Sequence, residues 1–167
     1  MIKQFLKAAI TASVLSLLAS AVWAQPALYV DGTHYETLPA PVRTNDAEKI
    51  EVLEVFWYGC GHCFRFQPLV DHWAENAPED VDYLRFPAIW NDLMKIHAQA
   101  YYTAENLGVV DTVHGPIFDA INLQRNRLQN ERQLAELFAA HGVDEEAFSR
   151  AFNSFQVRTK VNQAESK

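Results

Sequence analysis

Cysteine is scarce in this chain of 167 residues: Cys60 and Cys63 are the only two, and no second pair accompanies them. A structural zinc site needs four ligands, so this count argues against zinc. The histidines other than His62 are scattered without the spacing of metal ligands. A disulfide between the two cysteines would close a loop with only two intervening residues, which gives little entropic stabilisation. We therefore expect no bound metal, and a purely structural disulfide is the less favoured interpretation.

Positive charge is also in short supply. The chain has 14 Lys and Arg against 21 Asp and Glu, a formal net charge of −7 at pH 7. An acidic chain is a poor partner for nucleic acid and for anionic membrane surfaces. Disorder is excluded by a hydrophobic content of 49%. We expect a folded chain that binds no nucleic acid.

The first 24 residues have the three parts of a secretory signal. Lys3 and Lys7 supply a basic start, an uncharged apolar stretch covers 8–22, and Ala24 ends a cleavage site of small residues. The apolar stretch is shorter than the ~20 residues that a spanning helix needs. This favours a cleaved signal, residues 1–24, over a membrane anchor that stays attached. We expect the mature protein to be exported.

The two cysteines lie where one sequence pattern gives way to another. An apolar run at 50–58, rich in β-branched and aromatic residues, predicts a buried strand, and helical spacing follows over 61–76. A Cys-x-x-Cys at such a turn, here with Gly61 and His62 in the middle, places Cys60 over the free N–H groups of the helix. This position favours the thiolate, which is the form that attacks disulfides. The motif predicts redox chemistry carried by the sulfur pair itself, without an organic cofactor.

The remaining elements predict the fold class. A second strand is expected at 81–86, ended by Pro87, and a short strand is plausible at 34–38. After Trp90 the pattern is helical, and four helices are expected. The first covers 93–107 and is ended by Gly108, and the second has Pro116 in its first turn. The third and fourth are capped by Asn130 and Asp144, and the apolar stripe of the fourth consists of Phe148, Ala151, Phe152 and Phe155. Strand, redox helix and strand before a helical block predict an α/β chain. We expect a thioredoxin-like sheet with an inserted helical domain, divided as 25–90 and 91–167.

The motif also carries a resemblance. The segment EVFWYGCGHC at 54–63 closely resembles the active-site segment of the DsbA family of periplasmic thiol:disulfide oxidoreductases. His62, immediately before the second cysteine, is the discriminating residue, although some isomerases also carry Gly-His between their cysteines. The signal-like start and the helical block agree with the family's layout. The likeness runs from about residue 26 to the end of the chain.

The resemblance implies roles for individual residues. Cys60 would be the attacking, substrate-linked sulfur and Cys63 the buried resolving one. Glu54 matches the family's buried acidic residue beneath the disulfide, and Arg85 is expected as its basic partner, so that this pair tunes pKa values and relays protons. From the residues alone, Glu54 could also face solvent, because its strand is apolar on both sides. The helix N-terminus and His62 are both expected to stabilise the Cys60 thiolate, which makes the disulfide a stronger oxidant.

The resemblance further implies a protein disulfide oxidoreductase. It would donate the Cys60–Cys63 disulfide to reduced, unfolded exported proteins in the periplasm. A DsbB-like membrane quinone reductase would recharge it, and we expect a monomer. Two alternatives stay open from the residues: a disulfide isomerase or reductase, and a non-catalytic helical binding module with an incidental cysteine pair.

The chain departs from the family pattern in its last third. No proline follows Pro116, so the family's cis-proline loop, last two strands and closing helix are expected to be missing. A truncated chain is the favoured interpretation, and a true variant is the alternative. A sheet without those strands is expected to expose apolar surface.

Overall fold

The computed structural model describes residues 28–166, so the expected signal at 1–24 lies outside the described residues. The chain divides into two units, Met1–Arg43 and Thr44–Lys167. In the described part of the first unit, a single bridge joins Asp31 to Tyr35, and the Asp31 carboxylate accepts a hydrogen bond from the Thr37 hydroxyl at 2.8 Å. The strand expected at 34–38 is therefore wrong, because side-chain hydrogen bonds of a turn take the place of a ladder.

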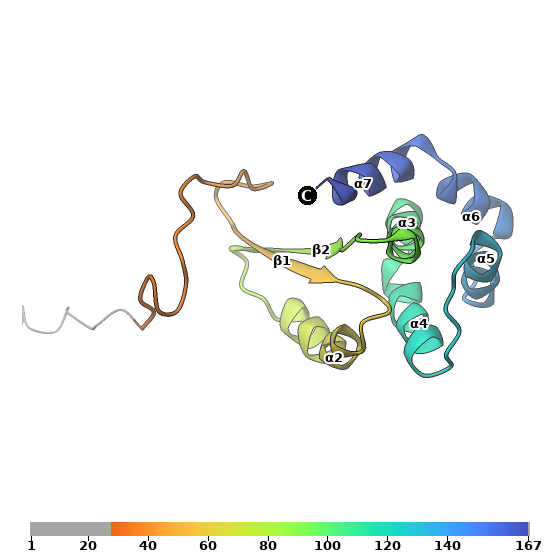
Figure 1. The fold of residues 1–167 in the computed structure, drawn as a ribbon, viewed down its shortest axis with the longest axis horizontal. Coiled ribbons are helices and arrows are strands. Elements are labelled where there is room, and N and C mark those ends of the chain that lie inside the picture. The colour runs from red at the N-terminus through yellow and green to blue at the C-terminus, as the bar shows by residue number, and fades with distance from the viewer. Residues whose placement is uncertain (1–27, 167) are drawn as a thin grey trace, which may run out of the picture. The chain divides into compact units, whose positions relative to one another are not determined.

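The second unit is built around a short parallel sheet (Figure 1). Strands β1 (Ile50–Phe56) and β2 (Val81–Pro87) are joined by helix α2 (Gly61–Glu75) in a β–α–β unit. β1 ends two residues earlier than expected, because the chain turns there and the Cys60 N–H donates to the Trp57 carbonyl at 2.9 Å. β2 runs through Pro87, which is tolerated at a strand end.

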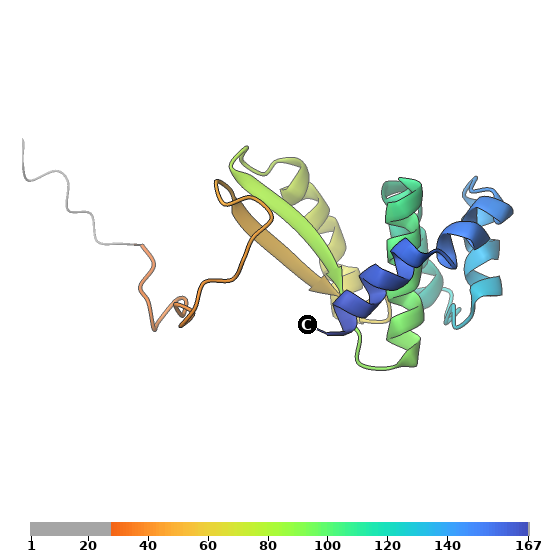
Figure 2. The ribbon, with the colours of Figure 1, turned by 90° about the horizontal axis from the view of Figure 1, so that it is seen from above.

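Five helices follow the sheet: α3 (Asp92–Leu107), α4 (Val110–Asn122), α5 (Glu131–Ala140), α6 (Glu145–Phe152) and α7 (Phe155–Glu165). In both ribbon views they lie beyond the carboxyl ends of the strands (Figure 2). Three expected helix ends are confirmed. Gly108 adopts φ 69° after α3, and the side chains of Asn130 and Asp144 accept backbone N–H bonds at the start of α5 and α6.

Two details of the helical block differ from expectation. Pro116 lies inside α4 rather than in its first turn, because the helix begins at Val110, two residues after the glycine that ends α3. The expected fourth helix is two helices, because the Ser154 side chain accepts from the Val157 N–H and starts a new one. Phe155 consequently lies outside the apolar stripe and is 79% exposed. None of the helices within 28–166 combines the length and apolar character needed to cross a membrane.

The core joins the sheet to the helices. Phe56 and Tyr58, at the end of β1 and just after it, pack edge-on against each other with ring centroids 5.1 Å apart, and Tyr58 packs against Phe118 of α4 at 4.9 Å. Residues on both sides of the expected boundary at 90/91 thus share one hydrophobic cluster. That division into 25–90 and 91–167 stays a prediction.

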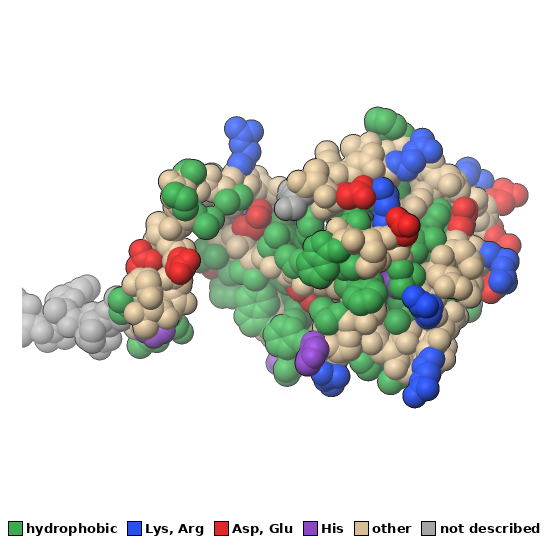
Figure 3. All heavy atoms as spheres, viewed as in Figure 1, with side chains coloured by type: hydrophobic (Ala, Val, Ile, Leu, Met, Phe, Trp, Pro, Cys, Tyr) green, Lys and Arg blue, Asp and Glu red, His purple; other side chains and the backbone are tan. Residues whose placement is uncertain are grey.

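One face of this unit is apolar and exposed, as expected for a sheet with few strands. Hydrophobic side chains gather over the region of α2 and the strands (Figure 3). A groove of about 460 Å³ lies there, and its lining includes Leu53, Phe66, Leu69 and Trp73, all of which are exposed. The helical spacing of these α2 residues therefore does not place them in the core.

Candidate active site

Cys60 is the residue that caps the N-terminus of α2. Its backbone is extended, and its Sγ accepts a hydrogen bond from the Cys63 N–H at 3.3 Å. Both cysteines are free thiols and partly buried. The expected position of the first sulfur over the unpaired N–H groups of the helix is confirmed.

The pKa values of the two thiols are shifted in opposite directions. Partial burial acts to raise the pKa of Cys60, but hydrogen bonds from the Cys63 thiol and from the backbone N–H groups of Cys63 and His62, together with the charge of Arg65, lower it below its ordinary value. Burial raises the pKa of Cys63, and its hydrogen bond to Cys60 and the negative charges of Cys60 and Glu54 raise it further. The geometry therefore favours a thiolate on Cys60 and a thiol on Cys63.

His62 is exposed, and its imidazole bonds to an arginine that the sequence analysis did not single out. Arg65 Nη2 lies 3.0 Å from His62 Nδ1. Because a guanidinium can only donate, Nδ1 is the acceptor in this contact. The hydrogen bond that Cys60 accepts from His62 comes from the backbone N–H and not from the imidazole. The expected effect of the imidazole on Cys60 stays a prediction.

Gly61 lies beside that arginine. A β-carbon at Gly61 would lie 3.6 Å from Arg65 Nη1, within ordinary contact distance. The guanidinium therefore lies against the Cys60–Cys63 turn, with one terminal nitrogen on His62 and the other next to Gly61.

Glu54 and Arg85 form the ion pair that the resemblance implied. Arg85 Nε lies 3.2 Å from Glu54 Oε2, and the two side chains are only 14% and 12% exposed. The alternative of a solvent-facing Glu54 is therefore wrong. The Tyr83 hydroxyl also donates to Glu54, and Arg85 bonds to Asp71 of α2 as well. The tuning and relay roles of Glu54 and Arg85 stay predictions.

A series of buried and partly buried hydrogen bonds extends from this ion pair to the loop before the cysteines. Gln67 Nε2 donates to Asp71 at 2.7 Å, and Gln67 Oε1 lies 3.2 Å from His114 Nε2. The amide oxygen must accept, so Nε2 of His114 carries the proton and Nδ1 accepts from the Tyr58 hydroxyl at 2.8 Å. The ion pair is thereby linked through Asp71 to Tyr58. Neither Asp71 nor His114 could be predicted as part of the site, because Arg85 is 14 positions from Asp71 and the partners of His114 are at least 47 positions away.

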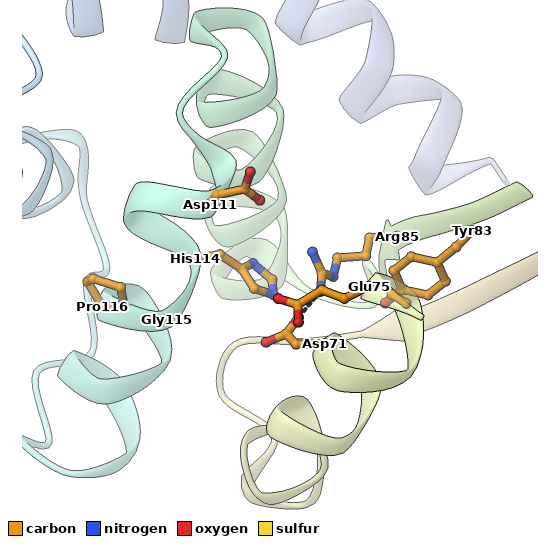
Figure 4. Close-up of a pocket in the computed structure, with 9 residues that line it drawn as sticks. Asp71, Glu75, Tyr83, Arg85, Asp111, His114, Gly115 and Pro116 are labelled. Atoms are coloured by element: carbon orange, nitrogen blue, oxygen red, sulfur yellow. Dashed lines mark hydrogen bonds and ion pairs between the residues drawn. The ribbon is translucent and has the colours of Figure 1, made fainter. Parts of the chain in front are cut away.

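A cavity lies next to this series of hydrogen bonds (Figure 4). It has a volume of about 490 Å³, and its polar lining includes Asp71, Glu75, Tyr83, Arg85, Asp111 and His114. Burial, and next the positive charge of Arg85, lowers the pKa of His114 to about 3. The imidazole therefore stays neutral at physiological pH and serves as a fixed hydrogen-bond link.

The loop before Cys60 is held by a second histidine. Trp57 Nε1 donates to His97 Nδ1 at 3.0 Å, and His97 Nε2 donates to the Arg127 carbonyl at 2.9 Å. Gly59 is required next to this indole, because an added β-carbon would lie 2.3 Å from the Trp57 ring. The loop is thus anchored to the helical block. Within 28–166, no three His, Cys, Asp or Glu side chains are grouped so that they could hold a metal ion.

No family model matches the chain. A curated relative, the thiol:disulfide interchange protein DsbA of Azotobacter vinelandii, is 41% identical over 152 residues, which cover 91% of this chain and 71% of the relative. This chain belongs to the DsbA family. The DsbA of Pseudomonas aeruginosa is 38% identical over 136 residues, or 81% of this chain and 64% of that protein. The DsbA-family chain described here thus matches between 64% and 71% of the length of these two relatives.

Solved DsbA structures agree with the fold. The crystal structure of Pseudomonas aeruginosa DsbA matches with a TM-score of 0.74 at 37% identity, over 77% of this chain and 67% of that one. DsbA from Xylella fastidiosa matches with a TM-score of 0.68 at 32% identity, over 72% and 66% of the two chains. The expected α/β, thioredoxin-like fold with a helical insertion is confirmed, as is the class of thiol:disulfide oxidoreductase. The alternative of an incidental cysteine pair does not agree with this membership.

Proposed function

We propose that this DsbA-family chain donates its Cys60–Cys63 disulfide to reduced, unfolded exported proteins. The observation that supports donation of the disulfide to a substrate is that the pKa of Cys60 is lowered while the pKa of Cys63 is raised. A stabilised Cys60 thiolate stabilises the reduced form, so the disulfide accepts electrons readily. A thiolate of low pKa is also a good leaving group.

The transfer takes two displacements. A substrate thiolate attacks Sγ of Cys60, a mixed disulfide forms, the Cys60–Cys63 bond breaks, and Cys63 leaves with the electron pair and takes up a proton. A second substrate thiolate then attacks the substrate sulfur of the mixed disulfide and expels Cys60 as thiolate. The substrate loses two electrons and forms a disulfide, and the cysteine pair gains the two electrons.

Glu54 has a role in the first displacement. Burial and the hydrogen bond to Cys60 raise the pKa of Cys63, and the Glu54 carboxylate raises it further, so the sulfur expelled there takes up a proton more readily than an ordinary thiolate does. Arg85 and the Tyr83 hydroxyl hold that carboxylate in place. Glu54 with Arg85 would thereby tune the resolving sulfur and relay its proton.

The signal-like start of the chain and its family support a setting for this activity. A cleaved signal at 1–24 would deliver a monomer to the periplasm. A DsbB-like membrane quinone reductase would reoxidise the pair after each transfer. The sulfurs themselves carry the two electrons, so the reaction calls for no metal or organic cofactor.

A disulfide-transfer assay tests the proposal. The oxidised full chain is mixed with a reduced, unfolded protein, and free thiols are counted with time; we expect close to one substrate disulfide per protein. Cys60→Ala should abolish transfer, while Cys63→Ala, added as a mixed disulfide with a small thiol, should accumulate a covalent complex with substrate through Cys60. Transfer that is independent of Cys60 would contradict the proposal. A reduction potential in the range of reductants would instead favour the isomerase or reductase alternative.

A further inference from the structure

We propose that Arg65 is a specificity-determining residue that directs disulfide transfer toward substrate cysteines flanked by acidic side chains. This inference rests on the proposed function, because it assigns a substrate class to the same sulfur pair. It concerns a residue that lies next to the motif rather than within it.

The Arg65 guanidinium lies next to the turn that contains the two cysteines. Arg65 lies one helical turn after His62, which places the two side chains on one face of α2. Nη2 is held 3.0 Å from His62 Nδ1, and Nη1 lies beside Gly61. A long, flexible cation is thus kept over the turn that carries both sulfurs, on the exposed side of the helix.

The guanidinium also retains its capacity to bind a carboxylate. Among residues 28–166, no carboxylate lies within ion-pair distance of Arg65, and its contact with His62 uses only one of its five N–H donors. A planar guanidinium can take a carboxylate through two parallel hydrogen bonds. Arg65 can therefore hold His62 and a substrate carboxylate at the same time.

The charges around the two sulfurs are divided between them. Besides burial and hydrogen bonds, the charge that acts on Cys60 is that of Arg65, and the charges that act on Cys63 are the negative ones of Cys60 and Glu54. The attacking group of the substrate is a thiolate, and it carries a negative charge when it approaches Sγ of Cys60. The positive charge at this end of the site thus attracts the attacking sulfur and acidic neighbours of it, although the chain as a whole carries a net charge of −7.

The experiment compares two dithiol peptides of equal length that differ only in flanking residues, Glu in one and Lys in the other. Each is oxidised by the oxidised full chain, and the second-order rate is followed by stopped-flow tryptophan fluorescence. Reaction of both peptides with a small neutral disulfide gives their intrinsic reactivity, which is divided out. The measured quantity is the corrected ratio of the Glu rate to the Lys rate.

We expect Arg65→Gln to lower this ratio about three-fold, the size that one exposed ion pair supports. Arg65→Lys should retain most of the ratio, and Arg65→Glu should lower it further. Arg158→Gln, which makes the same change in net charge on α7, away from α2 in Figure 1, should leave the ratio unchanged. Salt at 0.5 M should reduce the wild-type preference toward that of Arg65→Gln, because exposed charges are screened.

The outcomes separate this inference from the proposed function. If Arg65→Gln slows or speeds both peptides equally, the ratio is unchanged and the inference is overturned, while disulfide transfer itself stands. If the wild-type protein leaves both peptides reduced, the proposed function fails and the inference fails with it.

Discussion

Glu54 and Arg85 occupy paired positions in the two parallel strands, and their side chains meet with 3.2 Å between Oε2 and Nε. The strand register thus sets the ion pair, since a shift of one residue would turn the two side chains to opposite faces of the sheet. Arg85 also binds Asp71 of α2, so a single cation joins both strands and the helix that carries the cysteines. Arg85 therefore connects both strands to the helix at whose N-terminus Cys60 lies.

The two thiols of the reduced protein should lose their protons in a fixed order. We expect Cys60 to form a thiolate at lower pH than Cys63, with thiolate absorbance at 240 nm as the measurement. Cys63→Ala should raise the pKa of Cys60, because the hydrogen bond from the Cys63 thiol is lost while the backbone N–H bonds remain. A Cys60 titration that is unchanged in this variant would show that the neighbouring thiol contributes nothing.

Replacing His62 with leucine should raise the pKa of Cys60 and make the protein less oxidising. The variant removes the acceptor that holds the Arg65 guanidinium over the turn, and with it any hydrogen bond from the imidazole. Thiolate absorbance and equilibration with glutathione measure the two effects. His72→Leu, an exposed change on the same helix, serves as the control. An unaltered titration in His62→Leu contradicts the role of this side chain.

Glu54→Gln should lower the pKa of Cys63. The negative charge that opposes the Cys63 thiolate is removed, while the amide keeps an oxygen for the Tyr83 hydroxyl. The alkylation rate of Cys63 as a function of pH, in a Cys60→Ala background, isolates this effect. Glu51→Gln, on the same strand, should leave the profile in place. Equal profiles with and without Glu54 would refute the electrostatic link.

Arg85→Met should destabilise the protein by about 3 kcal/mol, because two carboxylates lose their shared cation and the Glu54 side chain is only 12% exposed. Arg85→Lys should cost less, since a cation remains. Arg150→Met breaks an exposed helical pair with Glu146 and should change stability by less than about 0.5 kcal/mol. Urea unfolding of the reduced proteins gives the comparison. Similar losses of unfolding free energy in Arg85→Met and Arg150→Met would contradict the expected difference between the largely covered and the exposed arginine.

Acid should destabilise the protein partly through His114. Its pKa is lowered to about 3 in the folded protein, below the ordinary value of 6.5, so the unfolded chain binds more protons between these values. Stability therefore falls as the pH drops from 6.5 toward 3. His114→Gln should weaken this dependence, measured as the free energy of unfolding against pH. His72→Gln, at an exposed position, should keep the wild-type slope.

Local patterns allowed much of the fold to be predicted. The strand-to-helix turn that puts Cys60 at the start of α2, the glycine after α3 and the side-chain caps of α5 and α6 depend on neighbours within a few residues. The break between α6 and α7 has a local signal too, the cap at Ser154, but the apolar spacing continued across it and concealed it. The site motif was equally local, since both cysteines and His62 lie in one turn.

The sulfur pair, its place at a helix N-terminus and the residue types around it could all be predicted from the sequence, because they follow from spacing along the chain. Two features of the site depend on how the chain packs: the pairing of the largely covered Glu54 with Arg85, and the hydrogen-bonded series of Tyr58, His114, Gln67 and Asp71. The residues of these contacts are far apart along the chain: Gln67 and His114 are 47 positions apart, and Asp71 and Arg85 are 14 apart. Residues so distant meet only when strands pair in register and helices pack, and no local pattern encodes which of them meet.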